Sequence, residues 1–244
     1  AKQPLLDAIA KTDLEVQGVL WYGDDATYER VDALLAEEAV QNADLIFGVG
    51  GGRAIDTCKV VADKAGKAYF SFPTVASNCA PSTAIAVMYK ADKSFAGYYY
   101  LPQPPIHTFI NMNIVVDSPF NLFWAGIGDA MSKECESELA SREAELFHTV
   151  SVGRALGKVC TAPLLDFGEK ALADFKKKEI SYELQEVVLD IIISTGLVSN
   201  CTTGDQAIYY YNSSVAHLFY NSSTVLPQVV EGHLHGEIVS FGVL

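Results

Sequence analysis

The sequence predicts a fold in two parts, an α/β domain followed by an all-helical domain. In the first part, short apolar runs that suit buried strands alternate with segments of helical spacing up to residue 117. This alternation is typical of a parallel sheet whose strands are joined by helical crossovers. After Pro119, almost every segment has helical spacing. We therefore expect one domain over residues 1–117 and a second over residues 118–244.

The elements of the first domain follow from local patterns. Residues 14–22 alternate apolar and polar side chains and contain many strand-forming residues, which predicts a strand. Asp25 can cap a helix that extends to about Gln41. Further along we expect a strand over 44–47, a helix over 53–64, a strand over 68–72, a hairpin formed by 84–89 and 95–101, and a strand over 107–116.

The second domain is predicted to consist of helices joined by short turns. The expected helices lie near 121–146, 149–159, 163–177, 182–200, 205–221 and from 236 onward, with Asp205 as the cap of the fifth. The chain stops within the last of these helices and does not begin with Met. We therefore expect it to be incomplete at both ends.

The composition argues against several classes of partner. The net charge is −13, and a surface this acidic repels nucleic acids and anionic lipids. The sequence has no run of 18 or more apolar residues and no secretory leader, so we expect no membrane span and no export. The five cysteines are odd in number, scattered and without a Cys-x-x-Cys pair, which is typical of reduced thiols in a cytoplasmic protein.

A glycine cluster made of Gly48, Gly50, Gly51 and Gly52 lies between an apolar run and a helical pattern. A strand, a glycine turn and a helix together let backbone N–H groups and a helix N-terminus approach a phosphate. The spacing differs from the Gly-x-Gly-x-x-Gly pattern of dinucleotide-binding folds. Alone, the cluster supports a phosphate site and a tight strand-to-helix turn about equally.

Potential metal ligands lie far apart in the second domain, at Asp129, His217, His233 and His235. Three protein ligands with an open position would form a catalytic divalent-metal site. However, the spacing matches no short metal-binding signature, and a lone histidine on an apolar helix face is usually a core residue. Asp129 could equally cap a helix. The residue types alone leave these interpretations open.

Taken together, the motifs resemble the glycerol dehydrogenase branch of the iron-containing, metal-dependent alcohol dehydrogenases. The resemblance extends over essentially the whole chain, because the order and spacing of the motifs match the family. These motifs are GVGGGRAIDTCK at 48–59, FPTVASNCAPSTAIAVMY at 72–89, AGIGDAMSKECES at 125–137, VAHLFYNS at 215–222 and HGEIVSFG at 235–242. The resemblance implies a Rossmann-like N-terminal domain and a helical C-terminal domain, the architecture shared with dehydroquinate synthase.

The resemblance also implies roles for individual residues. The glycines Gly48, Gly50, Gly51 and Gly52 match the loop over the pyrophosphate of the dinucleotide, and Asp56 follows on the helix after it. Other positions match the adenine and ribose side, at Thr74 and Ser77, and the nicotinamide side, at Thr83, Ile85 and Tyr89. NAD is the implied cofactor. NADP is the alternative, because the residue that separates them follows a strand that we expect to precede residue 1.

The catalytic centre implied by the resemblance is a metal ion, zinc or iron, held by Asp129, His217 and His235. Such an ion would act as a Lewis acid on the hydroxyl oxygen of a small polyol while a hydride passes to NAD. His233 falls just outside the ligand pattern, and we interpret it as a residue of the substrate cleft or of the surface. We expect a small-molecule alcohol or hydroxy acid as the substrate, and a homo-oligomer.

One residue departs from the family pattern. Cys79 stands where glycerol dehydrogenases typically carry an aspartate associated with binding the polyol hydroxyls. Loss of that carboxylate reduces repulsion toward negatively charged substrates. Cys79 is therefore a candidate specificity residue. A free cysteine can also serve only as a small apolar side chain that fills space in the protein. The main hypothesis is a glycerol or vicinal-diol dehydrogenase. The alternatives are a 2-oxoacid or hydroxycarboxylate reductase on the same fold and a catalytically inactive binding protein.

Overall fold

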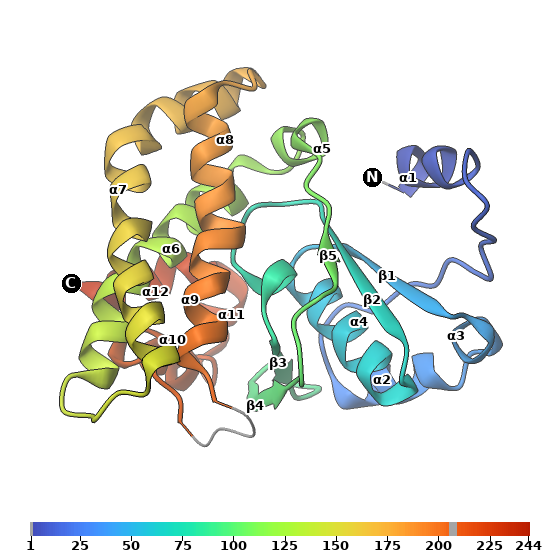
Figure 1. Cartoon of the computed structure of the whole chain (residues 1–244), viewed down its shortest axis with the longest axis horizontal. Coiled ribbons are helices and arrows are strands. Elements are labelled where there is room, and N and C mark those ends of the chain that lie inside the picture. Colours follow the sequence, from blue (N-terminus) through green and yellow to red (C-terminus); the bar gives the residue numbers. More distant parts are fainter. Residues whose placement is uncertain (1, 205–208) are drawn as a thin grey trace.

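The computed structural model describes residues 2–204 and 209–244. Figure 1 shows an α/β half that contains the sheet and a half built of helices, which meet side by side. All strands of five or more residues lie before residue 101, and the described part of the chain after residue 120 is dominated by helices. The predicted fold class, α/β followed by all-α, is confirmed.

The sheet of the first half is parallel, as the alternating pattern predicts. It contains β1 (Leu45–Gly50), β2 (Ala68–Pro73) and the short β5 (His107–Thr108), in the order β1-β2-β5. The crossover from β1 to β2 is α4 (Gly52–Ala65), which contacts both strands. Because α4 buries Val60 and Val61 against apolar side chains of the neighbouring elements, one local core holds this half together.

The predicted hairpin is confirmed as a separate two-stranded sheet. Its strands are β3 (Ile85–Tyr89) and β4 (Phe95–Tyr100), which pair antiparallel. A short 3-10 turn over Ala80–Ser82 leads into it. The apolar side chains of β3 pack on α4, so the hairpin covers the helix that follows the glycine cluster.

Two predictions for the start of the chain are wrong, and one helix there was not predicted. Residues 14–22, all described, form no strand, because no neighbouring strand pairs with them; apolar side chains such as Trp21 stay exposed there. The helix predicted from Asp25 is divided into α2 (Tyr28–Leu35) and α3 (Glu38–Asn42), and its cap is Thr27, whose side chain accepts the backbone N–H of Arg30. The unpredicted helix α1 covers Lys2–Ile9.

The strand predicted over 107–116 is also largely wrong. Only the two residues of β5 pair with β2, and α5 (Met112–Val116) follows after Asn111. The Asn111 side chain accepts the backbone N–H of Asn113 and so begins the helix. Val115 and Val116 then turn into the core of the helical half, where a helix buries them more fully than an edge strand would.

The helical half is organised around two long helices, α6 (Phe120–Ser141) and α7 (His148–Lys177). The sequence predicts a break in α7 before Pro163, but the helix is continuous. Proline removes one backbone hydrogen bond. Against that loss, small and apolar residues form one buried stripe on both sides of Pro163, including Gly157, Cys160 and Leu164. Packing of this stripe outweighs the missing bond.

The next helical segment lies in the core. It consists of α8 (Tyr182–Leu189), a π-helical turn over Asp190–Ser194, and α9 (Thr195–Thr202), close to the predicted 182–200. By length and composition alone, Tyr182–Thr202 could cross a membrane, yet 56% of its apolar window is buried inside the protein. Its apolar side chains belong to the main hydrophobic cluster with α6 and α7, which accounts for their number.

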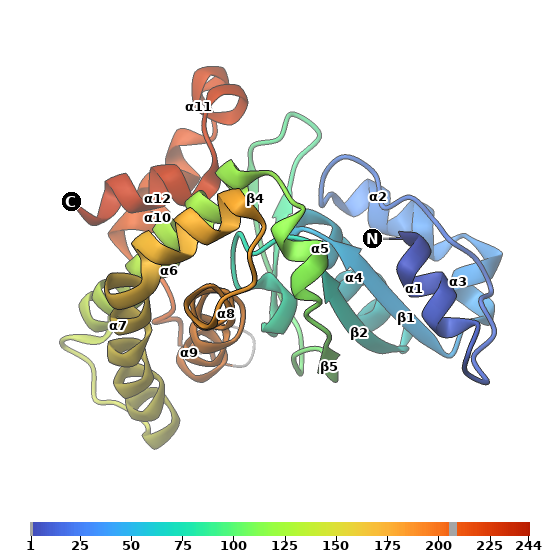
Figure 2. The same ribbon diagram turned by 90° about the horizontal axis from the view of Figure 1, so that it is seen from above.

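The last helices differ from the prediction. The proposed cap Asp205 lies outside the described residues, and residues 209–214 are not helical. The helix expected over 205–221 is α10 (Val215–Ser223). The helix expected from 236 is α12 (His235–Val243), and α11 (Pro227–Gly232) precedes it unpredicted. Figure 2 shows α10 and α12 beside α6, with α11 projecting away from them.

Polar and aromatic contacts join the two halves. The Asn200 side chain on α9 donates to the Ser82 carbonyl and accepts the N–H of Ala84. The rings of Tyr98 and Tyr210 stack with centroids 5.3 Å apart. These two tyrosines therefore lie where the two halves of the chain meet. The division into domains at residue 117 stays a prediction.

Candidate active site

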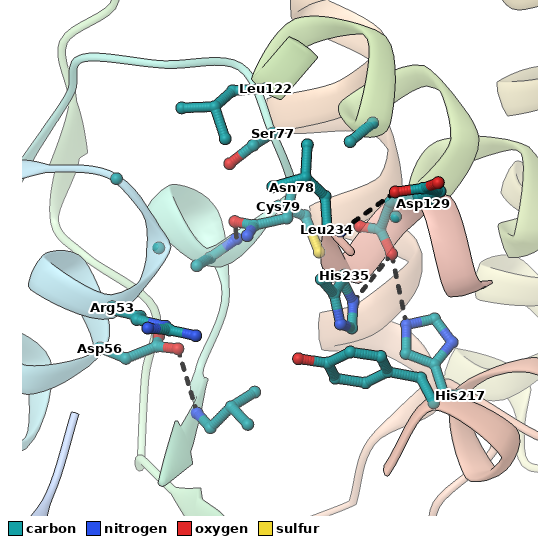
Figure 3. A pocket seen from close by; sticks show the side chains of 18 of the residues that line it. Arg53, Asp56, Ser77, Asn78, Cys79, Leu122, Asp129, His217, Leu234 and His235 are labelled. Carbon is teal, nitrogen blue, oxygen red and sulfur yellow. Dashed lines mark hydrogen bonds and ion pairs between the residues drawn. The ribbon is translucent and has the colours of Figure 1, made fainter. Parts of the chain in front are cut away.

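A cavity of about 710 Å³ lies between the two halves. Its size is that of a typical site for a small molecule or cofactor. One wall comes from the start of α4 and the segment before β3, and the other comes from α6, α10 and the start of α12. Figure 3 shows Arg53 and Asp56 on one side of this cavity, facing Asp129, His217 and His235 on the other.

Asp129, His217 and His235 come together from three different helices. Asp129 lies on α6 and is buried, His217 lies on α10, and His235 is the first residue of α12. Asp129 Oδ1 lies 3.4 Å from Nε2 of His217 and 3.1 Å from Nε2 of His235. One potential ligand atom from each residue lies within 4.8 Å of the other two.

Glycines allow the helices that carry these residues to approach. A Cβ atom at Gly236, next to His235, would lie 1.8 Å from the carbonyl oxygen of Ala125 on α6. A Cβ atom at Gly128, next to Asp129, would lie 2.8 Å from the carbonyl oxygen of Gly236. Both distances are far below contact, so only glycine lets α6 and α12 pack this closely. The glycines flanking Asp129 and His235 therefore set the spacing of the ligand atoms.

The donor set fits a divalent metal ion. Asp129 Oδ1 is buried and has no hydrogen-bond partner among the described residues, although two imidazole nitrogens face it. A buried carboxylate oxygen without a partner is costly. One carboxylate and two imidazoles are ligands that zinc and ferrous iron both accept. A cation among the three would satisfy all of them at once.

Glu136 supports this cluster and was not singled out from the sequence. Its carboxylate contacts Nδ1 of His217, which leaves Nε2 of that ring directed toward Asp129. The other oxygen of Glu136 accepts the backbone N–H groups of Ser214 and Ala216 at the start of α10. A carboxylate behind a ligating histidine fixes the tautomer and orientation of the ring.

The charges in this cluster shift its pKa values. Burial by itself would raise the pKa of Asp129, but His235 and His217 hold it well below its usual range. Burial would lower the pKa of His217, but Asp129 and Glu136 outweigh it and raise that pKa to about 9. The cluster is therefore one in which positive charge is strongly stabilised, whether a proton or a metal ion supplies it.

His233 lines the cavity but stays outside the cluster. Its side chain is 46% exposed, and its Nδ1 lies 3.0 Å from a carboxylate oxygen of Glu237. The position agrees with the interpretation of a cleft or surface histidine. Its predicted role toward the substrate stays a prediction.

The glycine cluster divides into two groups. Gly51 and Gly52 line the cavity where α4 begins, and the N-terminus of this 14-residue helix has no side-chain cap. Gly50 has φ +154 and turns the chain from β1 into the helix. Gly48 lies within β1, where the Tyr69 hydroxyl fills the space of its missing side chain.

The other residues predicted to bind the dinucleotide likewise fall into two groups, those that line the cavity and those that do not. Most of them line the cavity, namely Asp56, Ser77, Thr83, Ile85 and Tyr89. Gly48, Gly50 and Thr74 are not among its described lining residues, and the N–H of Thr74 donates to the Gly50 carbonyl instead. For these three residues the structure shows packing or turn-forming roles, and their predicted contact with the dinucleotide stays a prediction.

Asp56 has structural partners as well as a place on the wall. It forms a buried ion pair with Lys59 at 2.9 Å and accepts the N–H of Val87 on β3. Lys59 in turn donates to carbonyls of the turn before β3, including those of Ala80 and Thr83. This network attaches α4 to the hairpin and shapes the wall between them.

Cys79 lies on the wall of the cavity beside Asn78, on the segment before β3 (Figure 3). Burial raises the pKa of its thiol, despite the nearby Lys133, so the side chain is neutral at physiological pH. A neutral thiol is a poor nucleophile, which agrees with a role in packing or specificity. All five cysteines of the chain are free thiols.

Two lining residues, Lys133 and Asn212, were not predicted from the sequence. Lys133 and Glu136 follow Asp129 by four and seven residues on α6, so helical spacing places them on the same face as that ligand. This spacing is the signal that could have identified both. For Asn212 no comparable signal exists, because it lies on an irregular segment that only the fold brings to the cavity.

Comparisons with known proteins agree with this geometry. Residues 2–119 match the family model described as iron-containing alcohol dehydrogenase. The chain is 32% identical to a glycerol dehydrogenase from Thermotoga maritima, over 90% of this chain and 58% of that protein. It is 30% identical to hydroxycarboxylate dehydrogenase A from Escherichia coli (strain K12), over 86% of this chain and 57% of that protein.

Solved structures extend the likeness to the whole described fold. A crystal structure of a probable glycerol dehydrogenase from Sinorhizobium meliloti 1021 matches with a TM-score of 0.82 and 28% identity. The match covers 99% of this chain and 66% of that one. The chain therefore spans less than two thirds of the length of each of these three proteins.

Proposed function

The chain belongs to the iron-containing alcohol dehydrogenase family, and from this premise we propose that it acts in metal-dependent hydride transfer between a small alcohol and a nicotinamide dinucleotide. The observation that carries the proposal is the buried Asp129 Oδ1, which has no hydrogen bond among the described residues and faces His217 and His235 in a cavity that α4 also reaches. Packing alone gives no reason for such a costly arrangement.

In this proposal Asp129, His217 and His235 hold a zinc or ferrous ion. When bound, the metal would polarise the substrate oxygen, and the dinucleotide would accept the hydride, so that an alcohol becomes a carbonyl and one proton is released. Glu136 keeps the His217 ring oriented. His233, exposed at the cavity beside Glu237, can pass the released proton to solvent.

The dinucleotide is proposed to lie along the first half of the chain. The N-terminus of α4, with Gly51 and Gly52, offers free N–H groups and a favourable dipole to a pyrophosphate. Bulky side chains are absent at these two positions, which supports close approach of the backbone. The inner wall, with Thr83, Ile85 and Tyr89, would take the nicotinamide half. NAD is the proposed cofactor, with NADP as the alternative.

The first candidate substrate is a small polyol such as glycerol, the substrate in the name of the Thermotoga maritima relative. The second is a 2-hydroxy acid or its 2-oxo acid. A specific observation favours it, because Cys79 places a neutral thiol on the cavity wall near Asp129 where the family pattern has a carboxylate. A neutral wall repels a substrate carboxylate less than a carboxylate would.

The test is metal analysis of the purified protein combined with turnover of two substrates. Bound zinc or iron, together with NAD-linked oxidation of glycerol or NADH-linked reduction of 2-oxobutyrate, would support the proposal. Exclusive reaction of the oxo acid would replace the first substrate candidate by the second. Absence of metal, and of either activity after zinc or iron is added, would favour a catalytically inactive binding protein.

We also propose that the protein is a cytoplasmic homo-oligomer. The free cysteines support a reducing compartment. The long helix α7 exposes apolar side chains, including Val159 and Leu165, which are 59% and 67% exposed. A second copy of the chain would cover such residues. Light scattering coupled to size-exclusion chromatography measures the mass directly, and a monomer at micromolar concentration would contradict the proposal.

A further inference from the structure

We propose that Lys133 and Asn212 form a subsite for the carboxylate of the substrate, so that the cavity selects 2-oxo and 2-hydroxy acids over neutral polyols. This inference rests on the proposed function, because it names the substrate class of the same site. Its basis is a buried cation on the cavity wall, one helical turn from Asp129.

Lys133 is a buried lysine whose ammonium group contacts a neutral amide and forms no ion pair with a described carboxylate. It is 4% exposed, and its Nζ donates to Oδ1 of Asn212 at 2.9 Å. Among the described residues, this is its single side-chain partner, and no carboxylate lies within ion-pair distance. An ammonium group has three N–H donors and is seldom buried unless it is paired with an anion. Two of its donors are thus available to a ligand.

The acidic residues of the cavity are engaged elsewhere. Asp56 is paired with Lys59, Asp129 faces the two histidines, and Glu237 contacts His233. The remaining described acid on the wall, Glu231, is exposed. The charge of Lys133 is therefore not neutralised by a side chain of the described wall. An anionic ligand would supply the missing partner.

The position of Lys133 suits a substrate with its carboxylate next to the reacting carbon. Lys133 follows Asp129 by four residues, so both project from the same face of α6 about 6 Å apart along the helix axis. Both also line the same cavity. A 2-oxo acid places its carboxylate one bond from the carbonyl carbon. Its carbonyl oxygen can therefore face the cluster of Asp129, His217 and His235 while its carboxylate reaches Lys133.

Cys79 supports the same conclusion from the opposite wall. Cys79 and Lys133 line the same cavity, and the charge of Lys133 lowers the pKa of the Cys79 thiol while that of Asp129 raises it. An aspartate at this position would add a carboxylate to the cavity that Lys133 lines and would compete with a substrate carboxylate for the ammonium group. With a neutral thiol in its place, the ammonium group stays available, and hydrogen bonds from a charged donor to a carboxylate are among the strong ones.

The experiment compares two substrates that differ only in charge at one end, 2-oxobutyrate and the neutral ketone 1-hydroxy-2-butanone. The metal-loaded protein is assayed with NADH, and binding of the unreactive oxo acid analogue oxamate is measured by calorimetry. We expect Lys133→Met to lower kcat/KM for 2-oxobutyrate, and the affinity for oxamate, by about 10- to 100-fold. The neutral ketone should change by less than about 3-fold.

Two further variants keep the inference falsifiable. Lys133→Arg retains the charge and should recover much of the oxamate binding. Lys158→Met removes one charge from an exposed residue of α7 outside the described cavity lining and should leave both substrates unaffected. Thermal melts establish that each variant is folded. A misfolded Lys133→Met is replaced by Asn212→Leu, which removes the amide oxygen that holds the ammonium group in position and should weaken oxamate binding in the same direction.

The outcomes separate this inference from the proposed function. Equal losses for both substrates in Lys133→Met, or a preference of the unmodified protein for the neutral ketone, would overturn the carboxylate subsite while leaving the dehydrogenase activity standing. If neither substrate reacts, the proposed function fails. Oxamate binding then still tests the subsite, since an unchanged affinity in Lys133→Met would overturn it.

Discussion

At the scale of single residues, the site depends on groups that hold its ligands in place. His217 is oriented by Glu136, and the same carboxylate accepts backbone N–H groups at the start of α10. One acidic residue on α6 therefore links the position of a helix to the orientation of an imidazole. Glu136 is not among the described residues that line the cavity and acts through His217, so we regard it as a positioning residue.

Substitution of Glu136 tests this role. We expect Glu136→Gln to weaken zinc binding by about 10- to 100-fold, because an amide fixes the His217 tautomer less strongly than a carboxylate. Competition with a chelator measures the affinity. Glu134→Gln is the matched control, since Glu134 lies on the same helix and bonds to Thr161 instead of a histidine. Equal losses in both variants would mean that only the negative charge of the helix matters.

At the scale of elements, close helix packing creates the cluster. The start of α12 lies against α6 at Gly236, where any side chain would collide with the Ala125 backbone. Backbone cannot move aside as a flexible side chain can. The approach of these two helices is therefore what brings His235 to Asp129.

A methyl group at Gly236 should separate the helices. We expect Gly236→Ala to lower the free energy of unfolding by about 1–3 kcal/mol and to reduce metal affinity as His235 moves from Asp129. Urea unfolding and chelator competition measure the two effects. In the control Gly168→Ala, on α7, the new Cβ meets open space, and we expect a gain of about 0.5–1 kcal/mol from helix propensity. A fully stable Gly236→Ala protein that binds metal normally would contradict this account.

At the scale of the whole molecule, the main hydrophobic core of the helical half contains a buried carboxylate, that of Asp190, beside its apolar side chains. Asp190 is 2% exposed in the π-helical turn between α8 and α9, beside Ile191 and Ile192 of the core cluster. Neither of its carboxylate oxygens has a hydrogen-bond partner among the described residues. Burial raises its pKa from 3.8 to about 7. Ionisation of this group therefore opposes folding.

This shift predicts how stability depends on pH. Between about pH 4 and pH 7 the folded state holds a proton on Asp190 that the unfolded state has released, so this group lowers stability as pH rises through that window. Raising the pKa of Asp190 from 3.8 to about 7 corresponds to at most about 4 kcal/mol in the free energy of unfolding. We expect Asp190→Asn to be more stable than the unmodified protein at pH 8 and close to it at pH 4, by urea unfolding. An equal difference at both pH values would contradict the assignment.

The sequence by itself determined the elements whose causes are local. The alternating pattern and turn residues predicted the hairpin of β3 and β4, and apolar spacing predicted α4 and α6. Such features depend on neighbours within a few residues, which a sequence displays directly. The fold class followed from the same patterns, because alternating strands and helices admit few arrangements.

Only the tertiary structure decided features that depend on distant partners. Residues 14–22 have the composition of a strand but no strand beside them, and α7 continues through Pro163 because its buried stripe packs on both sides. Lys133 becomes a candidate for substrate binding only when the fold buries it beside Asn212, with no acidic partner among residues 2–204 and 209–244. The convergence of Asp129, His217 and His235 is likewise a property of helix packing, since three separate helices must meet for these side chains to share one ion.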